Sequence, residues 1–132
     1  MKKAIHISSL VFTGFSILSI AYVSIVSMID PQGTMDLVQV SLPNNDSISS
    51  IRGIYGGVGL AITFSLVYLL LRNLTMALSF LSMFWGFYAI SRLITLIVDG
   101  PLGDFGTQWL IIESVFCLIA ISLATLRVKA AK

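Results

Sequence analysis

Residues 51–98 read IRGIYGGVGLAITFSLVYLLLRNLTMALSFLSMFWGFYAISRLITLIV, two long apolar runs joined by a short polar break. Each run supplies the ~20 residues that an α-helix needs to cross a hydrocarbon core about 30 Å thick. The break at Arg72-Asn73-Leu74-Thr75 is so short that the two helices are expected to be antiparallel neighbours. This stretch therefore predicts a membrane hairpin.

Two more apolar runs flank this hairpin. Together the four runs predict membrane helices over residues 4–28, 51–72, 76–98 and 109–127. The chain has 132 residues, of which 57% are hydrophobic and only 11% charged, a composition well outside that of soluble domains. We expect an all-α membrane protein, with residues 1–132 forming a single integral membrane domain folded as an antiparallel four-transmembrane-helix bundle.

Charged residues divide the segments outside the helices into two groups. Basic residues lie at the N-terminus, in the break between the central runs and in the C-terminal tail: Lys2, Lys3, Arg72, Arg127, Lys129 and Lys132. The two longer connections carry acids instead: Asp30, Asp36, Asp46, Asp99 and Asp104. By the positive-inside rule we expect both termini in the cytoplasm and both longer loops outside. The expected location is the bacterial cytoplasmic (inner) membrane.

The first apolar run has a second interpretation. Lys2 and Lys3 precede it, and Ser19 and Ala21 are small residues of the kind found at a secretory cleavage site. The run is longer than the apolar core of a usual signal peptide, so we expect it to remain as a helix.

The second predicted helix begins with a glycine-rich segment. Gly53 and Gly57 have the small-xxx-small spacing that lets two transmembrane backbones approach closely, and Gly56 and Gly59 widen the same notch. We expect this end of the helix to pack tightly against a neighbouring helix.

Three ionisable residues lie near the same end of three predicted helices: Arg52, Arg92 and Glu113. Each costs about 2.5 to 3.5 kcal/mol to insert into a membrane, so three at matching depth indicate one shared site. At ~1.5 Å per residue, Arg92 lies about 9 Å inward from Val98 and Glu113 about 6 Å inward from Trp109. We expect a common outward-facing polar cavity, whose lining is completed by Tyr55, Tyr88 and Asp99.

This cluster has two interpretations. In the structural one, an ion pair between Arg92 and Glu113 joins the third and fourth helices, while Arg52 is held by Asp99 or reaches water. In the functional one, two guanidiniums and one carboxylate leave net positive charge in the cavity. Such a cavity favours a lipid phosphate, a carboxylate or a quinone carbonyl, bound through the forked donors of arginine.

The motif RGIYGG at residues 52–57, followed by Ser91-Arg92 and Asp99-Gly100-Pro101, resembles the small bacterial four-helix membrane proteins grouped as domain of unknown function 4345. The resemblance covers nearly the whole chain. It implies the four-helix fold and assigns no activity. The layout is also similar, more loosely, to that of the DoxX-like four-helix proteins.

The sequence shows few features of catalysis. It has no metal-ligand cluster, no nucleophile beside a histidine and no phosphate-binding glycine loop before a lysine. The single histidine, His6, disfavours a haem held by paired histidines, and the single cysteine, Cys117, excludes an intramolecular disulfide. We therefore expect no catalytic residue, no metal and no cofactor.

These features favour a non-catalytic accessory or interaction subunit, or a binder of lipid or another apolar ligand. The expected partners are membrane lipids and a larger membrane complex or a second copy of the chain, and no nucleic acid. Two alternatives stay open. One is a small proton-coupled transporter that uses Glu113, although the first helix lacks the acid that four-helix multidrug exporters carry there. The other is an intramembrane enzyme acting on a lipid or quinone, with Glu113 or Tyr88 as acid or base.

Overall fold

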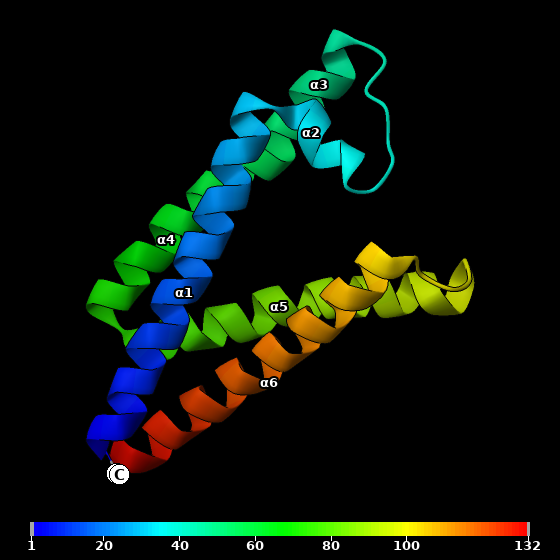
Figure 1. Cartoon of the computed structure of the whole chain (residues 1–132). Coiled ribbons are helices and arrows are strands. Elements are labelled where there is room, and N and C mark those ends of the chain that lie inside the picture. Colours follow the sequence, from blue (N-terminus) through cyan, green and yellow to red (C-terminus); the bar gives the residue numbers. More distant parts are fainter. Residues whose placement is uncertain (1, 132) are drawn as a thin grey trace. The chain divides into compact units, whose positions relative to one another are not determined.

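The computed structural model describes residues 2–131, and every regular element in them is a helix (Figure 1). In chain order these are α1 (Lys2–Ile29), α2 (Pro31–Asp36), α3 (Asn45–Ile51), the π-helix η1 (Arg52–Val58), α4 (Gly59–Arg72), α5 (Leu74–Val98) and α6 (Asp104–Ala131). Four spans are long and apolar enough to cross a membrane. They are α1, a second span that runs without a break through α3, η1 and α4, a third formed by α5, and a fourth formed by α6. The predicted class, all-α with four long apolar helices, is confirmed.

The long helices extend beyond the predicted apolar runs because polar residues continue them. Helix α6 begins at Asp104 rather than near Trp109, with the acid in its first turn, where a negative charge favours a helix N-terminus. The second span begins at Asn45. The Asn44 side chain accepts a hydrogen bond from the Ser47 amide at 2.9 Å, and the two residues form a capping box.

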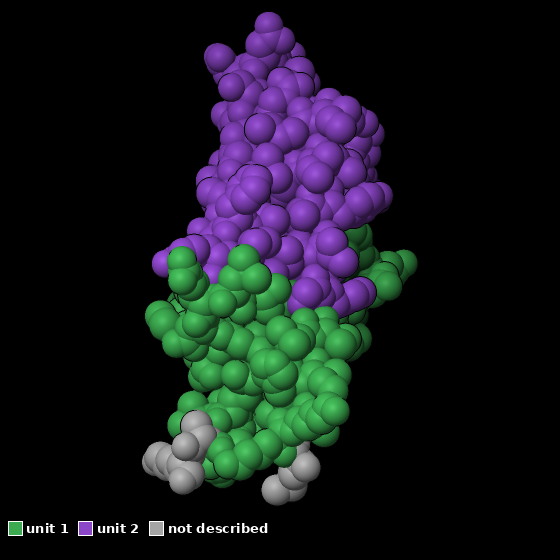
Figure 2. Space-filling view, turned by 90° about the vertical axis from the view of Figure 1, so that its left-hand side faces the viewer, with its two compact units in different colours: residues 1–13, 69–132 green, residues 14–68 purple. Residues whose placement is uncertain are grey.

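The chain divides into two compact units, which are coloured separately in Figure 2. Unit 1 contains the chain up to Thr13 and everything from Leu69 onward, so it holds the start of α1, the end of α4, and all of α5 and α6. Unit 2 is Gly14–Tyr68, with the rest of α1, α2, α3, η1 and most of α4.

Unit 1 is built on the antiparallel pair α5 and α6 (Figure 1). Asn73 starts α5, because its side chain accepts a hydrogen bond from the Met76 amide at 3.1 Å. The Phe116 ring of α6 lies 5.2 Å from that of Trp85 in α5 and 5.6 Å from that of Phe12 in α1. The core also contains small and branched side chains: Leu74, Ala77, Leu78, Leu81, Ala89 and Ala120.

In unit 2, the later part of α1 runs antiparallel to η1 and the first part of α4. A Cβ built on Gly56 would lie 2.6 Å from Met28 Cγ, and one on Gly59 would overlap Ser24 Oγ. The backbones therefore approach closely along this seam, as small residues allow in membrane helices.

The burial pattern of α1 is the reverse of that in a water-soluble helix. Its buried positions include a row of hydroxyl residues that are at most 1% exposed: Ser9, Thr13, Ser16, Ser24 and Ser27. Its exposed positions include Leu18 and Tyr22, both 70% exposed. Large exposed apolar side chains are suited to lipid, so this pattern agrees with a helix that crosses a membrane.

The connection after α1 is ordered by side-chain caps. Asp30 accepts a hydrogen bond from the Gly33 amide at 2.9 Å and so starts α2. Gln32 donates to Asp36 Oδ1 at 2.6 Å and accepts from the Leu42 amide at 2.8 Å, which ties the segment after α2 back to this helix.

Candidate functional site

Two of the residues in the predicted polar cluster, Arg92 and Glu113, form a forked ion pair between α5 and α6. Arg92 Nε donates to Glu113 Oε2 at 2.7 Å, and Arg92 Nη2 donates to Glu113 Oε1 at 3.0 Å. The Glu113 side chain is only 3% exposed, whereas the Arg92 side chain is 22% exposed. Both oxygens of the buried carboxylate thus accept hydrogen bonds from one guanidinium. This two-bond arrangement is the strongest form of an arginine–carboxylate ion pair.

The antiparallel packing of α5 and α6 places these two side chains opposite each other. Arg92 lies six residues before the end of α5 at Val98, and Glu113 lies nine residues after the start of α6 at Asp104. At ~1.5 Å per residue these positions are about 9 and 14 Å from the nearer helix ends. An unpaired carboxylate at this depth would be costly, so the pair allows both charges to remain inside the unit.

Tyr88 and Asp99 lie on the same helix as Arg92, on either side of it along the chain. Tyr88 is one turn before Arg92, is 41% exposed, and its ring centroid lies 5.1 Å from that of Phe84. Asp99 is the exposed C-cap of α5, and its amide donates to the Thr95 carbonyl at 2.8 Å.

Arg52 and Tyr55 belong to unit 2, in η1. The exposed Arg52 donates from Nε to the Met28 carbonyl at 2.8 Å. That carbonyl is in the last turn of α1, where backbone acceptors lack partners within the helix and a positive charge is favourable. Arg52 therefore caps α1. Tyr55 lies three residues after Arg52 in η1, and it is 37% exposed. The cavity shared by all six polar residues stays a prediction.

The four glycines predicted for helix packing have different surroundings. Gly56 and Gly59 lie against α1, where an added Cβ would meet Met28 and Ser24. A Cβ on Gly53 or Gly57 would meet nothing within 4 Å. The close approach to α1 therefore uses Gly56 and Gly59 rather than the pair with small-xxx-small spacing.

Sequence reasoning missed a polar contact at the other end of unit 1. Arg127 of α6 donates from Nε to Thr75 Oγ1 of α5 at 3.2 Å, and its Nη1 lies 3.1 Å from His6 Nδ1 of α1. An arginine nitrogen only donates, so His6 Nδ1 is the acceptor in this contact. A signal was present, since basic residues gather at both chain ends and no acid lies near them in the sequence.

Two buried donors in unit 1 were also missed as candidates. Thr13 Oγ1 and Trp85 Nε1 are shielded from solvent, and neither has a hydrogen-bond partner among residues 2–131. Buried polar groups are usually paired, so these two atoms leave hydrogen-bonding capacity unused inside the unit. Among the same residues, no group of three or more His, Cys, Asp or Glu side chains is placed to hold a metal ion.

Comparison with known proteins bears on the family alone. Residues 9–124 match the model of a protein family described as domain of unknown function DUF4345. No curated protein and no solved structure matches the chain. The family model spans most of the sequence, including the glycine-rich start of the second span and both residues of the ion pair. The chain belongs to the DUF4345 family.

Proposed function

We propose that this protein is a non-catalytic component of the bacterial cytoplasmic membrane that acts by binding, as an accessory subunit of a membrane complex or as a binder of lipid or another apolar ligand. The observation that carries the proposal is the closed ion pair between Arg92 and Glu113. Its geometry favours a structural role, because each carboxylate oxygen already accepts a charge-assisted bond.

The same pair weakens the two alternatives. A proton-coupled transporter needs Glu113 to accept and release protons, and an intramembrane enzyme would use Glu113 or Tyr88 as acid or base. In either role Glu113 would have to exchange both bonds to Arg92 during each cycle while only 3% of its side chain is exposed. Neither demand applies to a protein that binds without turnover.

Two further features support binding. The described helices carry many exposed apolar side chains, which suit a lipid or protein surface in the membrane. Inside unit 1, Trp85 Nε1 and Thr13 Oγ1 have no partner among the described residues, so a polar atom on an otherwise apolar ligand would find donors there. In the proposed orientation both termini face the cytoplasm.

The test is native mass spectrometry of the full chain, extracted gently from its own membrane, with identification of co-purifying lipids, small molecules and proteins. A stoichiometric protein partner or ligand, retained in a Glu113→Gln variant, is the expected result. A parallel measurement in proteoliposomes uses an internal pH dye. Proton flux that requires wild-type Glu113 and disappears in folded Glu113→Gln would overturn the proposal in favour of transport.

A further inference from the structure

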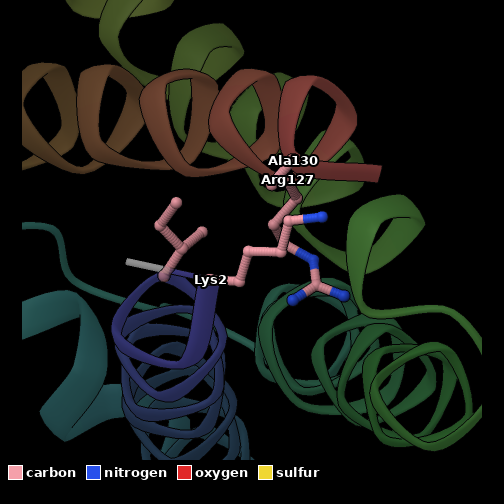
Figure 3. Close-up of a pocket in the computed structure, with 4 residues that line it drawn as sticks. Lys2, Arg127 and Ala130 are labelled. Carbon is pink, nitrogen blue, oxygen red and sulfur yellow. The ribbon is translucent and has the colours of Figure 1, made fainter. Parts of the chain in front are cut away.

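A hollow in the surface of unit 1 lies at the end opposite to the ion pair, where the start of α1 meets the end of α6. It has a volume of about 200 Å³ and is lined by Lys2, Ile5, Arg127 and Ala130 (Figure 3). The Lys2 and Arg127 side chains both extend over this hollow, while Ile5 and Ala130 make its wall partly apolar. The hollow therefore combines two cations with an apolar wall.

Arg127 is held in place by a hydroxyl group and an imidazole nitrogen. Its Nε donates to Thr75 Oγ1, and its Nη1 donates to His6 Nδ1. These contacts fix the orientation of the guanidinium and leave its charge uncompensated. The carboxylate of the ion pair, Glu113, is bound to Arg92, and the structure gives Arg127 no carboxylate partner among residues 2–131.

The sequence also places an excess of positive charge at this end of unit 1. All six acids of the chain lie in residues 30–46 and 99–113. Basic residues lie at the start of α1, at the junction of α4 and α5, and at the end of α6, and they include Lys2, Lys3, Arg72, Arg127 and Lys129. An anion would therefore meet basic side chains on three helices and no Asp or Glu side chain nearby in the sequence.

The size and position of the hollow limit the ligand. A volume of about 200 Å³ is large enough for a phosphate group. Exposed apolar residues, among them Ile7 at 49% in α1 and Leu126 at 44% in α6, lie on the same two helices as the hollow. A ligand with an anionic head and an apolar tail matches both features.

We propose that this hollow binds the phosphate of an anionic membrane lipid, with Lys2 and Arg127 as the phosphate-binding residues. The forked donors of arginine fit phosphate oxygens, and lysine adds a point charge. Basic pockets at the ends of membrane helices recognise anionic head groups in this way. The proposal does not depend on the role of the Arg92–Glu113 pair.

The experiment is a native mass spectrometry titration of the full-length protein with phosphatidylglycerol, and with phosphatidylcholine as the zwitterionic comparison. The test variant is Lys2→Gln/Arg127→Gln. The control is Lys3→Gln/Lys129→Gln, which removes the same charge from neighbouring positions that do not line this hollow. We expect at least a tenfold loss of phosphatidylglycerol affinity in the test variant and less than about a threefold loss in the control, with phosphatidylcholine binding unchanged in both.

Three outcomes would overturn the proposal. Equal losses in the two double variants would assign binding to diffuse surface charge, and unchanged binding in both would exclude the hollow. Complete displacement of the lipid by millimolar inorganic phosphate would assign the site to a soluble phosphate. If the test variant does not fold, Lys2→Gln against Lys3→Gln decides, because both lysines are exposed at the start of α1 and only Lys2 lines the hollow.

Discussion

Removing either partner of the Arg92–Glu113 pair should destabilise the protein, and removing both should cost much less than the sum. In Arg92→Leu, the carboxylate of Glu113 stays buried at 3% exposure without its two donors. Breaking a buried ion pair from one side costs about 3 to 5 kcal/mol, and the partial exposure of Arg92 places the expected loss near 3 kcal/mol. In Glu113→Leu, the 22% exposed guanidinium can turn toward water, so we expect about 1 to 2 kcal/mol.

The double variant Arg92→Leu/Glu113→Leu leaves no buried charge and fills the space with apolar atoms. Such replacements are often neutral, so its stability should lie within about 1 kcal/mol of the wild type. These values predict a coupling energy of at least ~2 kcal/mol between the two positions. The free energy of unfolding is measured in mild detergent by titration with sodium dodecyl sulfate, followed by far-ultraviolet circular dichroism.

Thr95→Val, an exposed change on the same helix, is the control and should alter the unfolding free energy by less than about 0.5 kcal/mol. Additive losses in the double variant would refute the reasoning, because they would mean that the two residues stabilise the protein independently. A double variant that is less stable than either single variant would also refute the reasoning.

Three other outcomes are expected. Gly59→Ala should lower the unfolding free energy by about 1 to 3 kcal/mol because its Cβ would overlap α1, whereas Gly57→Ala, whose Cβ meets nothing within 4 Å, should change it by less than about 1 kcal/mol; the two are compared by the same detergent titration. Iodide should quench the fluorescence of Trp109, near the start of α6, more than that of the buried Trp85, as measured in single-tryptophan variants with the other residue changed to Phe. A cysteine at Thr107→Cys should react with a membrane-impermeant maleimide added outside intact cells, and reaction only after lysis would reverse the predicted orientation.

Hydropathy predicted the four long spans because each must supply about twenty apolar residues, a requirement that is visible in any window of the sequence. The same windows placed the start of α6 near Trp109, since Asp104 and the polar residues after it lower the local hydropathy although they are helical. The two short helices between α1 and η1 depend on caps at Asp30 and Asn44. Such caps are recognised more easily in a structure than in a loop sequence.

The site was predictable to the extent that opposite charges in neighbouring helices tend to pair. Arg92 and Glu113 could be proposed as partners from their depths, but the fork geometry required the packed helices. The partner of Arg52 could not be predicted in this way, because it is the backbone carbonyl of Met28 and carries no side-chain signature. The contact of Arg127 with His6 joins residues from the two ends of the sequence. Helical periodicity relates residues three or four positions apart, so it could not predict this contact.

Because residues Arg52–Val58 form a π-helix, adding or deleting one residue in this segment would change the direction in which the neighbouring side chains point. Each residue of an α-helix turns the chain by about 100°, and a π-turn accommodates one residue more than an α-turn. Deleting a single residue between Gly53 and Val58 should let the segment continue as an ordinary α-helix and rotate Arg52 away from the Met28 carbonyl. The membrane span would remain long enough to cross, while the end of α1 would lose its cationic cap. Natural insertions and deletions here would therefore alter how two helices join without altering their number.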